Sequence, residues 1–147
     1  MVNFMFVGLF EHNIDNKGRV IVPAKLRDGL GDVFVMTYGL DGCLYAYTME
    51  GWEKFAAQFD DLPGTRSARM LQSMFFNNAV ECEVDKQGRI LIPANLRDKV
   101  GIQKEVVFAG DRNKVQVWSK ESYHAYEAEI ADADEVAEKV AEYGIVF

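Results

Sequence analysis

The sequence predicts an α+β fold, mainly β, in which two copies of one module form a small pseudo-twofold β-barrel with helices outside. Three observations predict this fold: a motif that occurs twice, β-branched runs that follow each copy, and helical patterns after each copy. The chain has 147 residues, which fits one compact domain or two small domains that share a core. Its residues are 49% hydrophobic and 27% charged, a composition that excludes wholesale disorder.

The repeated motif is the clearest feature of the chain. Residues 15–28 read DNKGRVIVPAKLRD, and residues 85–98 read DKQGRILIPANLRD. Eight of the 14 positions are identical, and three of the mismatches exchange one aliphatic residue for another. Average composition would give about one identity by chance, so the chain contains an internal duplication.

The first elements of each module are predicted to be two strands joined by a tight turn. In the first copy the strands span residues 6–14 and 19–22, and Asn16–Gly18 forms the turn. Gly18 suits a position with positive φ. The side chain of Asp15 suits the start of the turn, where it can accept a backbone N–H.

A short helix and a hairpin complete each module. Pro23 fits the first position of a helix over residues 23–30, because its missing N–H costs nothing there, and Gly31 can end that helix. Residues 33–38 and 43–47 then form a hairpin. The second copy repeats this order.

Helices are predicted between the copies and after the second one. Thr48 can cap a helix whose apolar positions are spaced i, i+3, i+4 and i+7. A further helix spans residues 65–76, and the tail forms helices over residues 119–130 and 134–143.

The domain boundaries follow from these elements. They are a first repeat at 9–51, linking helices at 52–78, a second repeat at 79–122 and an acidic helical tail at 123–147. A module of about 45 residues cannot easily bury its own core. Two modules that close on each other also remove exposed sheet edges, which is why we expect a shared barrel.

The charge distribution leaves room for a nucleic-acid partner despite the net charge of −7. Residues 120–147 carry eight acids and two bases, whereas residues 1–119 carry 15 acids and 14 bases. A local basic patch can therefore dominate one face of the body. The acidic tail is expected to pack away from DNA or to deter nonspecific binding.

Several other functions are disfavoured. Cys43 and Cys82 form no metal-ligand motif and are predicted to be small buried apolar residues. No phosphate-binding glycine motif occurs, and His12 and His124 lie beside no nucleophile motif. No stretch approaches the ~20 apolar residues of a membrane span. We therefore expect a cytoplasmic non-enzyme without catalytic residues, metal, cofactor, membrane contact or small-molecule substrate.

The pattern D-x-x-G-R-x-x-[IV]-P-x-x-L-R resembles the swapped-hairpin DNA-binding fold of the AbrB/SpoVT type. Its occurrence twice at this spacing resembles the MraZ family in particular, over nearly the whole chain. The resemblance implies a bacterial transcriptional regulator of the division and cell-wall gene cluster. It also implies a nucleoid-associated, ring-shaped homo-oligomer that binds short G-rich direct repeats in promoter double-stranded DNA.

The candidate DNA contacts are basic side chains of the motif, whose first copy contains four basic and two acidic residues. Arginine fits guanine O6 and N7 bidentately, and lysine suits phosphate. The predicted contacts are Lys17, Arg19, Lys25 and Arg27, with weaker second-copy candidates Arg89 and Arg97. The second copy is weaker because Gln87 and Asn95 replace two lysines. The turn-forming residues are Asp15, Gly18, Asp85 and Gly88.

Alternatives remain open at this point. Asp15 can form an ion pair with Arg19 or Arg27 that does no more than stiffen the turn. Both copies can bind DNA alike. The whole protein can also be a structural or protein-interaction ring without DNA binding, which would explain the repeat and the net acidity equally well.

Overall fold

The computed structural model describes residues 5–146, so the predicted end of the tail at residue 147 lies outside the described residues. The first repeat contains β1 (Leu9–Asn13), β2 (Arg19–Ile21), α1 (Ala24–Leu30), β3 (Val33–Tyr38) and β4 (Leu44–Thr48). The second contains β5 (Val80–Glu83), β6 (Arg89–Leu91), α4 (Ala94–Val100), β7 (Glu105–Asp111) and β8 (Lys114–Ser119). The remaining elements are α2 (Met49–Ala57), the 3₁₀ helix η1 (Gln58–Asp61), α3 (Arg66–Asn77), α5 (Lys120–Glu129) and α6 (Ala133–Ala141).

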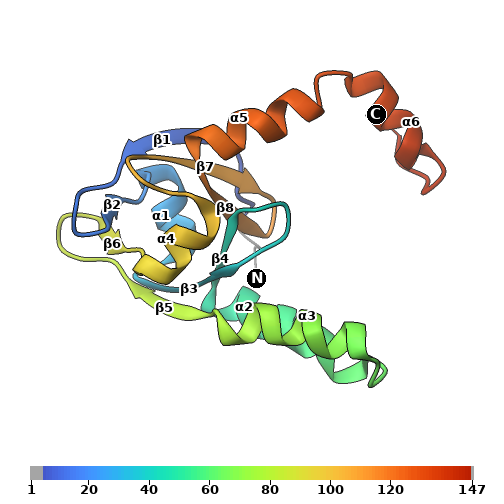
Figure 1. The fold of residues 1–147 in the computed structure, drawn as a ribbon, viewed down its shortest axis with the longest axis horizontal. Coiled ribbons are helices and arrows are strands. Elements are labelled where there is room, and N and C mark those ends of the chain that lie inside the picture. The colour runs from blue at the N-terminus through green and yellow to red at the C-terminus, as the bar shows by residue number, and fades with distance from the viewer. Residues whose placement is uncertain (1–4, 147) are drawn as a thin grey trace.

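The two repeats exchange their first strands. Six strands form one antiparallel sheet in the order β1-β7-β8-β4-β3-β5. Strand β1 therefore pairs with the hairpin of the second repeat, and β5 pairs with the hairpin of the first. This arrangement confirms an α+β fold, mainly β, built from two entwined repeats (Figure 1).

The sheet does not close into the barrel that the sequence predicted. Its edges are β1 and β5, while β2 and β6 pair with each other in a separate two-stranded ribbon. The physical reason lies in the turns after β1 and β5, where the chain leaves the sheet. The strands that could have closed a barrel instead form their own ladder.

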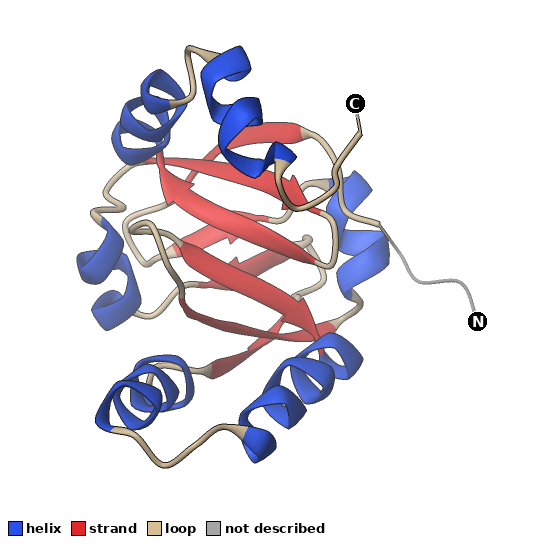
Figure 2. Cartoon of the chain, turned by 90° about the vertical axis from the view of Figure 1, so that its right-hand side faces the viewer, coloured by secondary structure: helices blue, strands red, loops and turns tan. Residues whose placement is uncertain are grey.

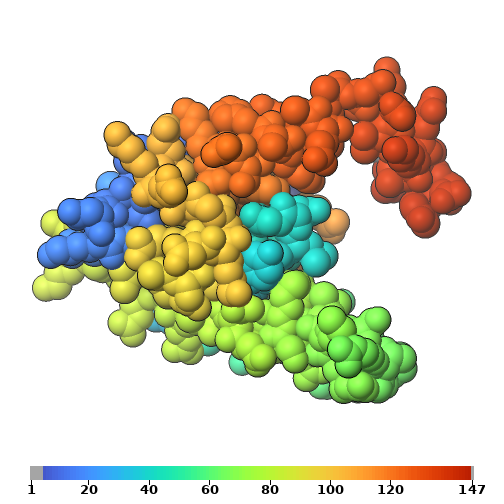
Figure 3. Space-filling view, in the orientation of Figure 1, coloured from blue at the N-terminus to red at the C-terminus, as the bar shows by residue number. Residues whose placement is uncertain are grey.

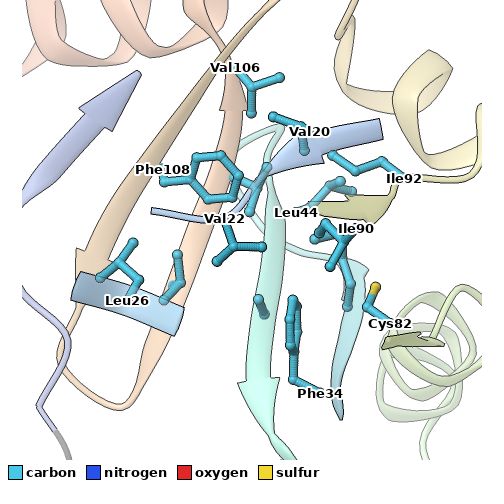
Figure 4. Close-up of a cluster of buried hydrophobic side chains, with 14 of the residues drawn as sticks. Val20, Val22, Leu26, Phe34, Leu44, Cys82, Ile90, Ile92, Val106 and Phe108 are labelled. Carbon is cyan, nitrogen blue, oxygen red and sulfur yellow. The ribbon is translucent and has the colours of Figure 1, made fainter. Parts of the chain in front are cut away.

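The main core lies between the ribbon, the short helices and one face of the sheet. Val20 and Ile90 from the ribbon, Leu26 from α1, and Phe34 and Phe108 from the sheet are all buried in one cluster (Figure 4). Because side chains alternate along a strand, the residues between these point to the other face.

That other face is aromatic and carries the longer helices. Tyr45, Tyr47 and Trp118 are buried in a second cluster, and side chains of α2, α3 and α5 pack against it. Phe75 of α3 stacks on Tyr45, with 6.2 Å between the ring centroids. Figure 2 shows two helical arms, α2 with α3 and α5 with α6, at opposite edges of the sheet.

Polar side chains set where the helices begin. The predicted cap is confirmed, because the Oγ1 atom of Thr48 accepts the N–H of Gly51 at 2.8 Å. Thr65 and Ser119 were predicted as first helical residues but cap α3 and α5 instead, so these helices begin one residue later. Pro23 likewise precedes α1, with an extended ψ of 132°.

The two cysteines are buried, as predicted. Burial raises the pKa of each thiol to about 12, so both remain protonated at neutral pH. Across residues 5–146 no helix has the length and apolar character that crossing a bilayer requires.

Candidate nucleic-acid interface

The ribbon formed by β2 and β6 has one solvent face and one core face. Its register places Arg19 opposite Leu91, Val20 opposite Ile90, and Ile21 opposite Arg89. Because successive side chains alternate, the two arginines share the outer face with Ile21 and Leu91. Ile21 is 44% exposed and Leu91 is 55% exposed, whereas Val20 and Ile90 are each 1% exposed. The outer face therefore presents two arginines on a narrow, partly apolar platform.

Each arginine is held by the aspartate that begins its turn. In the first copy Asp15 Oδ1 accepts the backbone N–H groups of Lys17 and Arg19, each at 2.9 Å. Its Oδ2 atom accepts Arg19 Nε at 3.2 Å. Gly18 has a φ of 88°, which confirms the predicted turn. The predicted pairing of Asp15 is thus with Arg19.

The second copy repeats this geometry. Asp85 Oδ1 accepts the N–H groups of Gln87 and Arg89 at 2.9 Å, and Oδ2 accepts Arg89 Nε at 3.0 Å. Gly88 has a φ of 79°. The two turns are therefore nearly equivalent, although the second one carries glutamine where the first carries lysine.

The same bonds keep both carboxylates charged. The N–H of Arg19 is the main cause that lowers the pKa of Asp15, and the N–H of Arg89 does the same for Asp85. The ion pairs recorded for Arg19 and Arg89 across residues 5–146 use Nε alone. Their side chains remain 37% and 28% exposed. This leaves the terminal nitrogens of each oriented guanidinium for a ligand.

Arg27 and Arg97 occupy a different place, which sequence reasoning missed. Each lies against the glycine of the opposite turn. A Cβ atom on Gly88 would stand 1.8 Å from Arg27 Nη1, and one on Gly18 would stand 3.0 Å from Arg97 Cζ. Arg97 Nε also donates to the carbonyl of Ile92 at 2.9 Å. The two arginines are half-buried, and each packs against the turn of the other repeat.

Backbone bonds join the same parts. The N–H of Val22 donates to the carbonyl of Gly88 at 2.9 Å, and that of Ile92 donates to Gly18 at 2.8 Å. Each turn is therefore fastened to the other repeat. The sequence signal is the equal spacing from glycine to arginine in both copies, but spacing alone does not reveal a contact between copies.

The lysines lie at the margin of this surface. Lys17 is exposed in the first turn, Lys86 is exposed in the second, and Lys25 is exposed on the first turn of α1. The two turns and the ribbon arginines thus contain four basic residues and two acidic ones. Both acidic residues are already paired with the ribbon arginines. Among the described residues no group of three histidine, cysteine or acidic side chains could hold a metal ion.

Comparison with known proteins matches this duplicated architecture. The family model described as "MraZ protein, putative antitoxin-like" matches residues 5–73 and again residues 75–142. The chain belongs to the MraZ family. Each MraZ match begins before the first strand of a repeat; the first ends within α3, and the second ends one residue after α6.

Similar proteins carry the name transcriptional regulator MraZ. One from Lachnoclostridium phytofermentans is 50% identical over 143 residues, which cover 97% of this chain and 100% of that protein. One from Clostridium beijerinckii is 49% identical over 142 residues, covering 96% and 100%. MraZ membership makes the chain a transcriptional regulator.

Proposed function

We propose that the chain regulates transcription by placing the β2/β6 ribbon in the major groove of double-stranded DNA. The major groove is wide enough for a two-stranded ribbon, and its base edges distinguish all four base pairs. The observation that supports this proposal is the outer ribbon face. There, Arg19 and Arg89 are oriented through Nε and keep their terminal nitrogens available.

The side chains divide the work by chemistry. Arg19 and Arg89 read guanine O6 and N7, which agrees with G-rich boxes. Lys17 and Lys25 contact phosphates, which set register without reading sequence. Arg27 and Arg97 brace the turns and add positive charge beside the backbone of the DNA. The shared face supports a contribution from both copies, although the lysine pattern favoured the first.

Assembly into an oligomer strengthens the weak DNA binding of a single ribbon. A ring-shaped homo-oligomer presents several ribbons, so short direct repeats are held at high effective concentration. Head-to-tail contacts that close also suit direct repeats better than palindromes. We propose that these boxes lie in the promoter of the division and cell-wall gene cluster, and that the protein associates with the nucleoid in the cytoplasm.

The test is a mobility-shift titration with a fragment from upstream of the protein's own gene, beside a scrambled fragment, at several salt concentrations. Arg19→Ala should weaken specific binding about 10- to 100-fold, because one bidentate guanine contact is worth about 1–3 kcal/mol. Arg19→Lys should keep the salt dependence but lose most of the discrimination between fragments. The control is Lys54→Ala on α2, which removes one charge from the opposite face of the sheet.

Two outcomes would contradict the proposal. Normal binding by an Arg19→Ala/Arg89→Ala double variant would remove the ribbon as the reader. A wild-type protein that forms rings in light scattering but shows no salt-dependent DNA shift would favour the alternative, a structural or protein-interaction ring. That alternative draws its support from the net charge of −7.

A further inference from the structure

Helices α3 and α6 are counterparts in the two repeats but carry opposite charge. Helices α2 and α3 follow the hairpin of the first repeat, and α5 and α6 follow that of the second. Helix α3 contains two arginines and no acid. Helix α6 and its flanks contain five acids and one lysine: Asp132, Asp134, Glu135, Glu138, Glu142 and Lys139. Duplicated elements have therefore diverged into a basic helix and an acidic one.

The basic helix has an open, amphipathic face. A shallow groove of about 470 Å³ is lined by residues 66, 69, 70, 73, 74, 77 and 78, which recur at the three- and four-residue spacing of one helix side. This side combines the guanidinium groups of Arg66 and Arg69 with Met70, which is 58% exposed. Within the described part of the chain, no other element lines this groove.

The acidic helix has the complementary pattern. Val136, Val140 and Tyr143 share one side because they are four and seven residues apart. Tyr143 is 75% exposed and Val136 is also exposed, so this apolar side has little cover. Acidic residues border it, and they match the arginines of α3 in charge.

The two helices lie on separate arms of one molecule. Figure 1 shows the α2/α3 arm and the α5/α6 arm diverging from the body, and Figure 3 shows open space between the outer parts of these two arms. We infer that α6 of one copy docks in the α3 groove of a second copy, pairing acids with arginines around an apolar seam. This inference rests on the ring that we proposed above.

Such a contact would be heterologous, because it joins two different surfaces. Heterologous contacts place successive copies head to tail and generate a closed ring when the rotation permits closure. The ribbon lies on the side of the molecule away from both arms (Figure 1), so docking leaves it free for DNA. The same contact would therefore arrange ribbons in one repeated orientation.

The test uses charge reversal on each helix in the full-length protein. One variant carries Arg66→Glu and Arg69→Glu, and the other carries Glu135→Lys and Glu138→Lys; Asp132 stays because its side chain caps α6. Each variant alone should lose the oligomer mass measured by light scattering. Mixing the two variants, or combining all four changes in one chain, should restore it. Glu53→Lys on α2 is the matched control and should leave the mass unchanged.

The outcomes separate this interface from the proposed function. A wild-type oligomer whose mass survives both reversals would overturn the α3–α6 contact while leaving the ring intact. A wild-type monomer would overturn both the ring and this contact. A reversed variant should still bind a single DNA box within about twofold but should lose the extra affinity for two boxes, whose gain comes from linkage. An equal loss on one box would place α3 or α6 at the DNA instead and overturn the inference.

Discussion

At the scale of single residues, Asp15 and Asp85 determine what the two turns can present. Each carboxylate accepts two backbone N–H groups and one guanidinium Nε. A structural role, in which the ion pair stiffens the turn, is therefore compatible with a DNA-binding role for the same arginine. The ion pair occupies one edge of the guanidinium and aims the other edge outward.

This bonding predicts how stability responds to acid. The pKa of Asp15 and of Asp85 lies below the ordinary 3.8. Stability from these carboxylates is therefore fully present above the ordinary value and is lost as pH falls through the lowered one. Melting temperatures measured from pH 7 to pH 2 should fall less steeply below pH 4 in Asp15→Asn/Asp85→Asn than in the wild type. An identical acid slope in both proteins would show that these bonds do not stabilise the fold.

At the scale of elements, the ribbon depends on close approach between the repeats. Each turn needs a glycine because φ is positive there, and an arginine from the other repeat packs against it. This contact is closest at Gly88, where Arg27 Nη1 occupies the place of a Cβ atom. The short helices α1 and α4 thereby position the turns that flank the candidate DNA face.

Alanine at these glycines should destabilise the protein. We expect Gly88→Ala to lower the free energy of unfolding by about 1–2 kcal/mol, because an L-residue is strained at positive φ. It also displaces Arg27, because the added Cβ would stand 1.8 Å from Arg27 Nη1. Denaturant titration measures this loss. Gly64→Ala is the control, since nothing lies within 4 Å of the added Cβ, and it should change stability by less than about 0.5 kcal/mol. Equal losses in both variants would refute the packing argument.

At the scale of the whole molecule, the exchange of strands makes each repeat depend on the other. Strand β1 completes the sheet beside β7, and β5 completes it beside β3. The core cluster likewise draws on both ribbon strands and both short helices.

Cutting the chain between the repeats should therefore prevent either half from folding as a monomer. Residues 1–78 and 79–147, purified separately, should show weak secondary structure or self-association, because each half leaves strand edges open. Mixing them should recover the circular dichroism spectrum of the intact chain. A folded monomer formed by residues 1–78 alone would contradict this view of the shared core.

The sequence by itself determined the duplication, the turns and the order of elements. Asp15 and Gly18 could be assigned to the turn because turn formation depends on the side-chain and φ preferences of adjacent residues. The predicted start of α3 was wrong by only one residue, with Thr65 as the cap, because capping also depends on neighbouring residues. The candidate DNA-contacting lysines and arginines could be identified because they belong to the repeated motif itself.

Only the tertiary structure decided which strands pair and where the arginines lie. Several short apolar strands could pair at the same sheet edges. No local sequence rule predicts that β2 pairs with β6 and that the large sheet stays open. The packing of Arg27 against Gly88 likewise joins residues far apart in the sequence, and the tertiary structure also places α3 and α6 on separate arms. Such choices depend on how the two repeats bury a common core, which is a property of the packed chain as a whole.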